Sequence, residues 1–168
     1  MKIFAIDTGN VESAYVIVDS KTLEPIEIKK TLNEHVMSRL DSFIDRCNQN
    51  NQKFDVAIEM VASYGMAVGK SVFDTVLMIG RFYEATLRGR RAPNLIYRKD
   101  EKMNLCYSMR ANDSNITQAL IDRFAPGVRN KGKGTKASPG WFYGFKKDIW
   151  QAYAVAVTFA DMKKRGEI

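Results

Sequence analysis

Cysteine, histidine and proline are all scarce in this chain. Its 168 residues include two cysteines, one histidine and four prolines. The two thiols, Cys47 and Cys106, are too few for a disulfide scaffold, and with the lone His35 they do not make a zinc site. The sequence therefore favours a reducing compartment, and it favours oxygen ligands wherever a metal is bound.

Long hydrophobic runs are also missing. No apolar stretch approaches the roughly 20 residues that a membrane-spanning helix needs, and the N-terminal MKIFAID runs into a strand pattern rather than a secretory signal. We therefore expect a cytoplasmic protein with no membrane partner. A composition that is 45% hydrophobic and 27% charged suits a single globular domain over residues 1–168.

Positive charge is abundant and unevenly distributed. The net charge of +7 and the pI of about 9.4 favour a polyanionic partner. Residues 126–147 contain five glycines, the aromatic run Trp141-Phe142-Tyr143, no Asp or Glu, and six basic residues that we predict to bind DNA: Arg129, Lys131, Lys133, Lys136, Lys146 and Lys147. Basic side chains bind phosphates and aromatic rings stack on bases. The alternative is a solvated loop whose aromatic side chains pack inward.

Hydrophobic periodicity predicts an α/β fold. The expected strands are residues 2–7, 13–19, 25–31, 54–61 and 94–98, and the expected helices are 34–48, 71–88, 113–124 and 147–164. The first three strands should form an antiparallel meander, and the strands joined by helices should pair in parallel. Asn33 and either Asp113 or Ser114 are expected to cap helices. The 71–88 helix is apolar nearly all round, which predicts burial on a second side, for example by a partner subunit.

Carboxylates stand near the ends of two apolar strands. Asp7 ends the first strand and Glu59 lies near the end of the fourth. Neighbouring strands lie about 4.8 Å apart, so the two side chains can converge where ligands bind in α/β sheets. Two buried carboxylates repel each other and lose hydration, and a cation relieves both problems. Asp148, in the first turn of the last helix, adds a third oxygen ligand, which suits Mg²⁺ or Mn²⁺.

Each acid also has an ordinary structural interpretation. Asp7 is consistent with a turn residue that binds its own backbone, and acids such as Asp148 are common at helix N-termini. Glu59 is harder to explain in this way, because glutamate is a poor residue for an apolar strand. The combination of the three acids favours a metal site.

Four motifs, in this order and spacing, resemble the RuvC-type Holliday-junction resolvases, especially their phage branch. They are IDTGN (6–10), IEMVASYGM (58–66), NDSNITQALIDRF (112–124) and KKDIWQAYAVAV (146–157). The resemblance covers almost the whole chain. It implies an RNase H-like fold with a mixed sheet of about five strands flanked by helices. It also implies a homodimer and metal-dependent cleavage of branched DNA by two-metal phosphodiester hydrolysis.

The resemblance also assigns roles by position. Asp7, Glu59 and Asp148 would be the catalytic ligands of two Mg²⁺ or Mn²⁺ ions, with Asp7 bridging them. This chain departs from the bacterial members at Thr8, where they have proline, and at Gln151, where they have an acid. The junction wedge would fall to Tyr64 or Met66, with Lys70 nearby as a further DNA contact. The possible site neighbours are Gln151, Asp113 and Lys102, and Lys99, Lys102 and Lys136 are alternatives for neutralising the developing charge.

Two other classes of function stay open. A branched-DNA binding protein that has lost cleavage is favoured by Gln151 in place of an acid. An actin-like or sugar-kinase-like nucleotide-binding fragment is favoured by the Asp-Thr-Gly-Asn turn, which resembles a phosphate-binding turn. Those ATPases need two such domains, and 168 residues supply one. Among DNA substrates, a four-way junction, a three-way junction and a fork are equally compatible with the sequence, and we expect recognition of shape.

Overall fold

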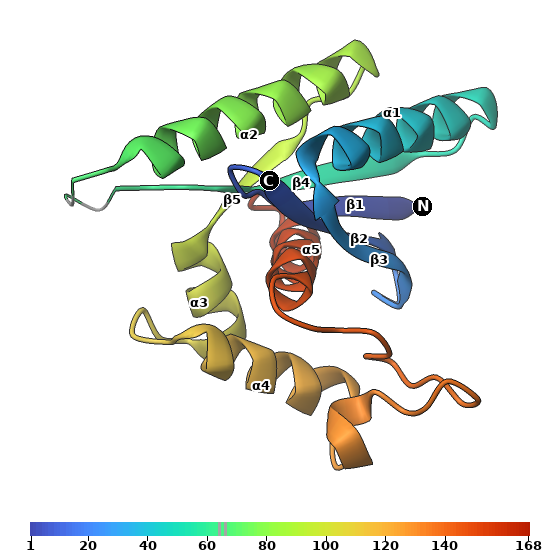
Figure 1. The fold of residues 1–168 in the computed structure, drawn as a ribbon. Coiled ribbons are helices and arrows are strands. Elements are labelled where there is room, and N and C mark those ends of the chain that lie inside the picture. The colour runs from blue at the N-terminus through green and yellow to red at the C-terminus, as the bar shows by residue number, and fades with distance from the viewer. Residues whose placement is uncertain (64, 66) are drawn as a thin grey trace.

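A mixed five-stranded sheet forms the centre of the computed structural model, which describes residues 1–63, 65 and 67–168 (Figure 1). The strands are β1 (Lys2–Asp7), β2 (Glu12–Asp19), β3 (Pro25–Leu32), β4 (Phe54–Met60) and β5 (Asn94–Tyr97). Their spatial order is β3-β2-β1-β4-β5. The first three pair in an antiparallel meander, whereas β1–β4 and β4–β5 pair in parallel. This confirms the predicted sheet.

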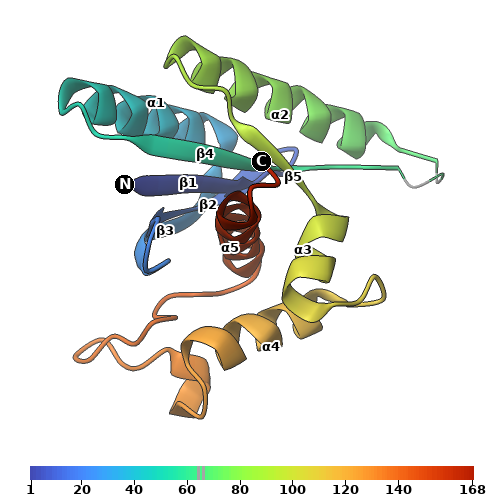
Figure 2. The same cartoon turned by 180° about the vertical axis from the view of Figure 1, so that it is seen from behind.

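Helices cover both faces of the sheet (Figure 2). On one face lie α1 (Asn33–Gln49) and α2 (Lys70–Arg88), and on the other lies α5 (Ile149–Arg165). Beyond α5 pack α3 (Arg98–Cys106) and α4 (Asp113–Phe124), followed by a short 3-10 helix, Arg129–Gly132. Within the described part of the chain, no helix combines the length and apolarity needed to cross a membrane.

The core explains why β1 and β4 are apolar on both faces. Ile3 and Ala5 of β1 belong to the cluster under α5, and the alternate residues Phe4 and Ile6 belong to the cluster under α1 and α2. Side chains alternate along a strand, so Asp7 continues the series that faces α5. Fully buried alanines, Ala152 and Ala156 among them, let α5 lie close to the sheet.

Three local features differ from the sequence predictions. Helix α3 was not predicted, because its sequence RKDEKMNLC carries few apolar residues and no amphipathic stripe. Asn33 is not a helix cap, since Leu32 occupies the N-cap of α1. The cap of α4 is Asn112, which exchanges hydrogen bonds with Asn115, so Asp113 is free for other contacts.

Candidate metal centre and nucleic-acid interface

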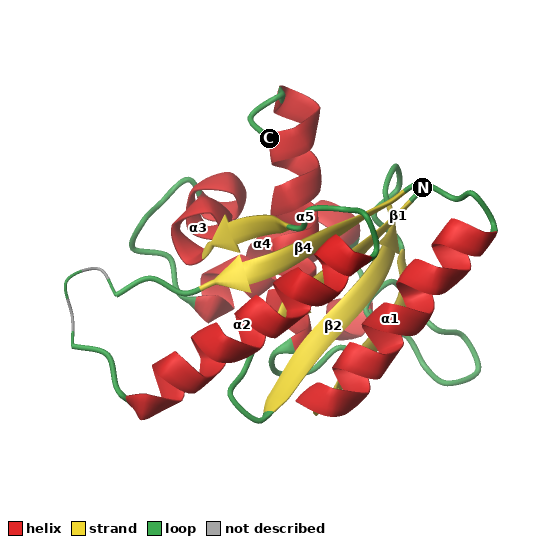
Figure 3. Ribbon diagram, turned by 90° about the horizontal axis from the view of Figure 1, so that it is seen from above, coloured by secondary structure: helices red, strands yellow, loops and turns green. Residues whose placement is uncertain are grey.

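Asp7 and Glu59 meet at the carboxyl ends of two neighbouring parallel strands. Ala5 pairs with Ala57 across β1 and β4, so the acids two residues further along lie side by side on the face toward α5. Figure 3 shows β4 and β5 ending at the same edge of the sheet. The hollow there has a volume of about 350 Å³ and is lined by Asp7, Gly9, Glu12, Glu59, Arg98, Asp113, Asp148 and Gln151.

The protonation of this carboxyl pair is strongly perturbed. Burial, reinforced by the negative charges of Glu59 and Asp148, raises the pKa of Asp7 to about 9. Burial and the negative charge of Glu101 raise the pKa of Glu59 to about 7. A proton on Asp7 is stabilised by a hydrogen bond to Glu59. Without a cation, the pair therefore keeps a shared proton near neutral pH.

The turn after β1 is clamped by polar side chains that are distant in sequence. The Ser13 hydroxyl accepts from the Gly9 amide at 3.2 Å and donates to Asn33 Oδ1 at 2.6 Å, while Asn33 Nδ2 donates to the Gly9 carbonyl at 3.0 Å. A side chain on Gly9 would sit only 2.2 Å from the Glu12 carbonyl oxygen, so glycine is required. Asn33 thus holds the turn that carries Asp7, a role the sequence reading missed.

Asp148 reaches the hollow from the start of α5, where it occupies the N-cap position. Its Oδ2 lies 2.5 Å from Nζ of Lys30 on β3, and the same ammonium lies 3.8 Å from Glu12. The third predicted ligand therefore lines the same hollow as Asp7 and Glu59, but it is already paired with a lysine.

Arg98 is a site residue that the sequence reading missed. It follows β5, the third parallel strand, and begins α3. Its Nη1 donates to Glu101 Oε2 and to Gln151 Oε1, each at 2.5 Å, and its Nη2 donates to Asp113. Glu101 is completely buried. The sequence offered one indication of this role. Arg98 follows the carboxyl end of a parallel strand, which is the same kind of position that selected Asp7 and Glu59.

The donor set fits a hard divalent cation at Asp7 and Glu59 better than it fits a complete three-acid cage. Among residues 1–63, 65 and 67–168, no group of three or more His, Cys, Asp or Glu side chains is arranged to hold a metal ion. Asp7 and Glu59 nevertheless offer carboxylate oxygens whose charges lack a basic hydrogen-bond partner in the described chain. The hydroxyl of Thr8, beside Asp7, is buried and also unpartnered among these residues. Oxygen donors of this kind suit Mg²⁺ or Mn²⁺.

A second hollow joins the acidic site to the basic loop. It measures about 480 Å³, shares Asp113, Asp148 and Gln151 with the first, and is flanked by Lys131 and Lys147. Both lysines have left-handed backbone conformations, with φ of 54° and 45°, a geometry that costs about 1–2 kcal/mol for a side chain of this kind. Of the predicted DNA contacts, these two lie beside the carboxylates.

The remaining predicted contacts are distributed differently. Arg129, Lys133, Lys136 and Lys146 lie on the same loop outside that hollow, and Lys70 is exposed at the start of α2. Lys102 donates to the Met109 carbonyl at 3.4 Å and does not line the acidic hollow. The predicted wedge residues, Tyr64 and Met66, lie outside the described residues.

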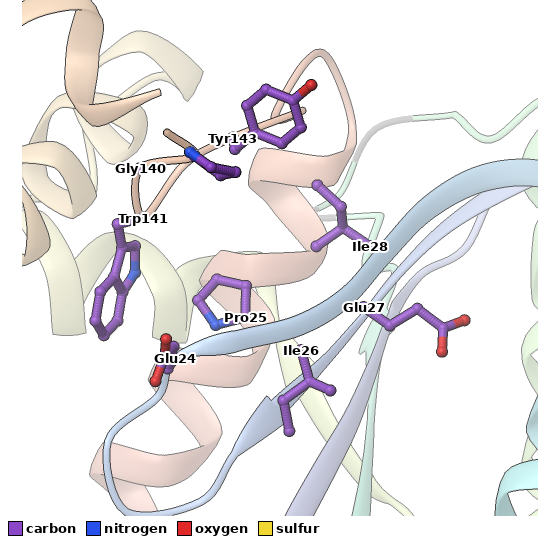
Figure 4. A pocket seen from close by; sticks show the side chains of 9 residues that line it. Glu24, Pro25, Ile26, Glu27, Ile28, Gly140, Trp141 and Tyr143 are labelled. Carbon is purple, nitrogen blue, oxygen red and sulfur yellow. The ribbon is translucent and has the colours of Figure 1, made fainter. Parts of the chain in front are cut away.

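The aromatic side chains of the loop mostly pack inward. Phe142 is fully buried, and Trp141 stacks on Phe124 and donates to the Tyr153 hydroxyl at 2.9 Å. Tyr143 is exposed beside a separate hollow of about 410 Å³ at the start of β3 (Figure 4). Glu24 and Glu27 line that hollow, so it does not extend the basic surface toward phosphate.

The comparisons with known proteins rest on structure rather than on sequence. No family model and no curated protein matches the chain. Three layers with a β3-β2-β1-β4-β5 mixed sheet define an RNase H-like α/β fold. Among the solved structures that match this fold are two of Thermus thermophilus RuvC. One has a TM-score of 0.68 at 13% identity, covering 99% of this chain and 97% of that one. The other, RuvC in complex with a Holliday junction substrate, has a TM-score of 0.67 at 12% identity, with coverage of 99% and 96%. The likeness shows that this chain has the RuvC fold.

Proposed function

We propose that this protein is a divalent-cation-dependent endonuclease that cleaves Holliday junctions or other branched DNA. The observation that carries the proposal is the Asp7–Glu59 pair, which lies at adjacent strand ends with its pKa values raised by burial and by nearby negative charges. Its position on a fold shared with RuvC, one structure of which holds a Holliday junction, supports branched DNA as the substrate. The phage-branch assignment stays a prediction.

The chemistry follows from what the side chains hold. Asp7 and Glu59 would hold Mg²⁺ or Mn²⁺, which when bound lowers the pKa of water and offsets phosphate charge. The water oxygen bonds to phosphorus and gives up a proton, the bond from phosphorus to the 3′ oxygen breaks, and the leaving oxygen takes up a proton from solvent. Lys131 and Lys147 would bind the DNA backbone beside the reacting phosphate. Asp148 would move from Lys30 to the cation or remain as the partner that positions Lys30.

The outer surface of α2 supports the proposed homodimer. Phe73 and Leu77 are 62% and 68% exposed, and Val76 is also exposed on this helix, whose opposite side packs in the core. Large apolar side chains in a row on one helix are typical of an interface. A second copy related by a two-fold axis would present two sites to two strands of a symmetric junction. We expect Leu77→Asp to shift the protein from dimer to monomer in sedimentation equilibrium, whereas an unchanged mass would remove this interface from the proposal.

The experiment that tests the proposed function is incubation of the purified protein with a labelled four-way junction and a linear duplex of matched sequence. Reactions contain Mg²⁺, Mn²⁺ or EDTA, and Asp7→Asn is run in parallel. We expect nicking of the junction with either metal, little nicking of the duplex, and none with EDTA or the variant. Three-way junctions and forks in the same assay identify the preferred branched substrate.

A second candidate, a branched-DNA binding protein without cleavage, is favoured by specific contacts. Gln151, where the family resemblance implies an acid, accepts a hydrogen bond from Arg98, and Asp148 is paired with Lys30. Tight, junction-selective binding of the wild-type protein with no nicking in either metal would support this candidate and contradict the nuclease.

A further inference from the structure

Arg98 occupies the side of the acidic hollow between Glu59 and the start of α5. Asp7 ends β1, Glu59 lies near the end of β4, and Arg98 follows β5. Because these three strands are parallel, the three side chains lie at one edge of the sheet. Its positive charge is close enough to lower the pKa of both Asp7 and Glu59 against the larger effect of burial. The Arg98 side chain lines the hollow and is 21% exposed.

The guanidinium is fixed in place by groups behind and beside it. Glu101 has no solvent exposure, and its Oε2 accepts from Arg98 Nη1 at 2.5 Å. Gln151 Oε1 accepts from the same nitrogen at 2.5 Å, and Asp113 accepts from Nη2. A guanidinium has five N–H donors, and these contacts use three. Within the described residues, the Nε–H and one Nη2–H therefore remain for an anionic ligand in the hollow.

Apart from Asp7 and Glu59, each acid that lines the hollow (Glu12, Asp113 and Asp148) already has a basic partner. The side-chain oxygen of Gln151 accepts from Arg98, and Asp148 Oδ2 is 2.5 Å from Lys30. Asp113 also accepts from Arg98. The fixed positive charge beside Glu59 opposes a second divalent cation, because like charges in a partly buried site repel strongly. The Asp7–Glu59 pair is then the ligand set left for a cation.

We infer that each site holds one divalent cation, at Asp7 and Glu59, and that the Arg98 guanidinium supplies the second positive charge at the scissile phosphate. This rests on the proposed nuclease function, and it replaces the two ions that the family resemblance implied. Arg98 is then a catalytic residue that donates its free N–H groups to phosphate oxygens, and Glu101 is a positioning residue that aims it. A planar, permanently charged guanidinium suits this contact with phosphate.

The test counts ions directly. Mn²⁺ binding is measured without DNA by calorimetry and by electron paramagnetic resonance of free Mn²⁺, for the wild type, Asp7→Asn and the double variant Arg98→Gln/Gln151→Glu. We expect one ion per wild-type chain and none in Asp7→Asn. We expect two ions in the double variant, which removes the guanidinium and adds an acid on α5.

Junction cleavage by Arg98→Gln, measured at saturating DNA and saturating Mn²⁺, tests the catalytic role. We expect a loss of at least about 100-fold in kcat, DNA affinity within about threefold of the wild type, and partial rescue by Arg98→Lys. Arg46→Gln is the matched control, because it makes the same change on an exposed arginine near the end of α1 and should leave kcat unchanged. If Arg98→Gln unfolds because Glu101 is left unpaired, Arg98→Gln/Glu101→Gln removes both partners and tests the same loss.

The outcomes separate this inference from the proposed function. Two ions in the wild type, or an Arg98→Gln kcat equal to that of the wild type, would overturn the arginine role and leave the nuclease intact. No ion in the wild type, together with no cleavage, would overturn both. One ion with the predicted loss of kcat supports both.

Discussion

The strand-end site and the basic loop are built in opposite ways. Asp7 and Glu59 stand on adjacent parallel strands whose pairing sets their separation, and burial perturbs their pKa values. Residues 126–147 are largely exposed and contain little regular structure beyond a 3-10 helix. The sheet fixes the geometry of the two acids, whereas the loop carries exposed positive charge. Under the proposed function, changes at the sheet edge should affect cleavage, and changes in the loop should affect DNA binding.

The largest expected effect separates the two regions at Asp7. Asp7→Asn removes a carboxylate from the cation site, so we expect cleavage of the four-way junction to fall at least about 1,000-fold. Junction binding, measured by gel shift in EDTA, should stay within about threefold of the wild type because the loop is untouched. If Asp7→Asn binds the junction tenfold more weakly but still cleaves it, Asp7 contributes to DNA binding rather than to the cation site.

The complementary change is made in the loop. The double variant Lys131→Gln/Lys147→Gln should weaken junction binding about 10- to 100-fold near physiological salt, and the slope of log K against log salt should fall by about 2. Manganese stoichiometry should be unchanged, because neither lysine is a ligand. The control is Lys21→Gln/Lys53→Gln, two exposed lysines at the other end of the strands, in the β2–β3 turn and directly before β4. Equal losses of junction affinity in both double variants would mean that the loop lysines contribute no more to DNA binding than other exposed lysines do.

A pH series sharpens the assignment of the cation site. Cation binding must displace the proton that Asp7, with its pKa raised to about 9, shares with Glu59, with its pKa raised to about 7. We therefore expect the apparent Mn²⁺ affinity to rise about tenfold per pH unit between pH 7 and 9, where the pair holds about one proton, and more steeply below pH 7. Calorimetry in buffers of different ionisation enthalpy should detect about one proton released per ion. A pH-independent affinity would contradict the shared proton.

The same shifts predict the stability of the metal-free protein. The folded-state pKa values of both acids exceed their ordinary values of 3.8 and 4.5, so the folded state binds protons more tightly than the unfolded state. The contribution of these two acids to stability is then greatest below their ordinary pKa values and declines as pH rises toward the folded pKa values. In EDTA we expect Tm to fall between pH 6 and 9, and Asp7→Asn to reduce that fall. Added Mn²⁺ should restore the wild-type Tm at pH 8.

The smallest expected effect concerns the clamp on the β1–β2 turn. Asn33→Ala removes the hydrogen bonds to Gly9 and Ser13, and it should destabilise the fold by about 1–3 kcal/mol. Cleavage should fall severalfold at temperatures where the variant is folded, because the turn carrying Asp7 is less well held. Asn50→Ala, which removes an exposed bond at the other end of α1, serves as the control. If Asn33→Ala keeps the wild-type kcat, Asn33 contributes to the stability of the fold but not to the positioning of Asp7.

Much of the sheet could be predicted from the sequence, because apolar runs and side-chain alternation are visible within each short segment. The apolar runs of β1 and β4 predict buried parallel strands, and the period of two places Asp7 and Glu59 on one face. The predicted meander and the helix between residues 113 and 124 are likewise confirmed. These features depend on neighbours a few residues apart, which the sequence displays directly.

The rest of the site depends on contacts that sequence spacing does not reveal. Arg98 meets Gln151 and Lys30 meets Asp148 across distant parts of the chain. Helix α3 has no apolar stripe, so neither the helix nor the buried acid Glu101 could be predicted from periodicity. Lys131 and Lys147 lie near the hollow in backbone turns with positive φ, and residue type alone does not predict such turns at lysines.

The most direct test of the central claim is anomalous diffraction from crystals of the protein soaked in Mn²⁺ without DNA. We predict one strong peak between the carboxylates of Asp7 and Glu59, at about 2.0–2.3 Å from their oxygens, and no peak beside Arg98. A peak that lies elsewhere, or no peak at a Mn²⁺ concentration that supports cleavage, would contradict the assignment of the strand-end acids as the cation site.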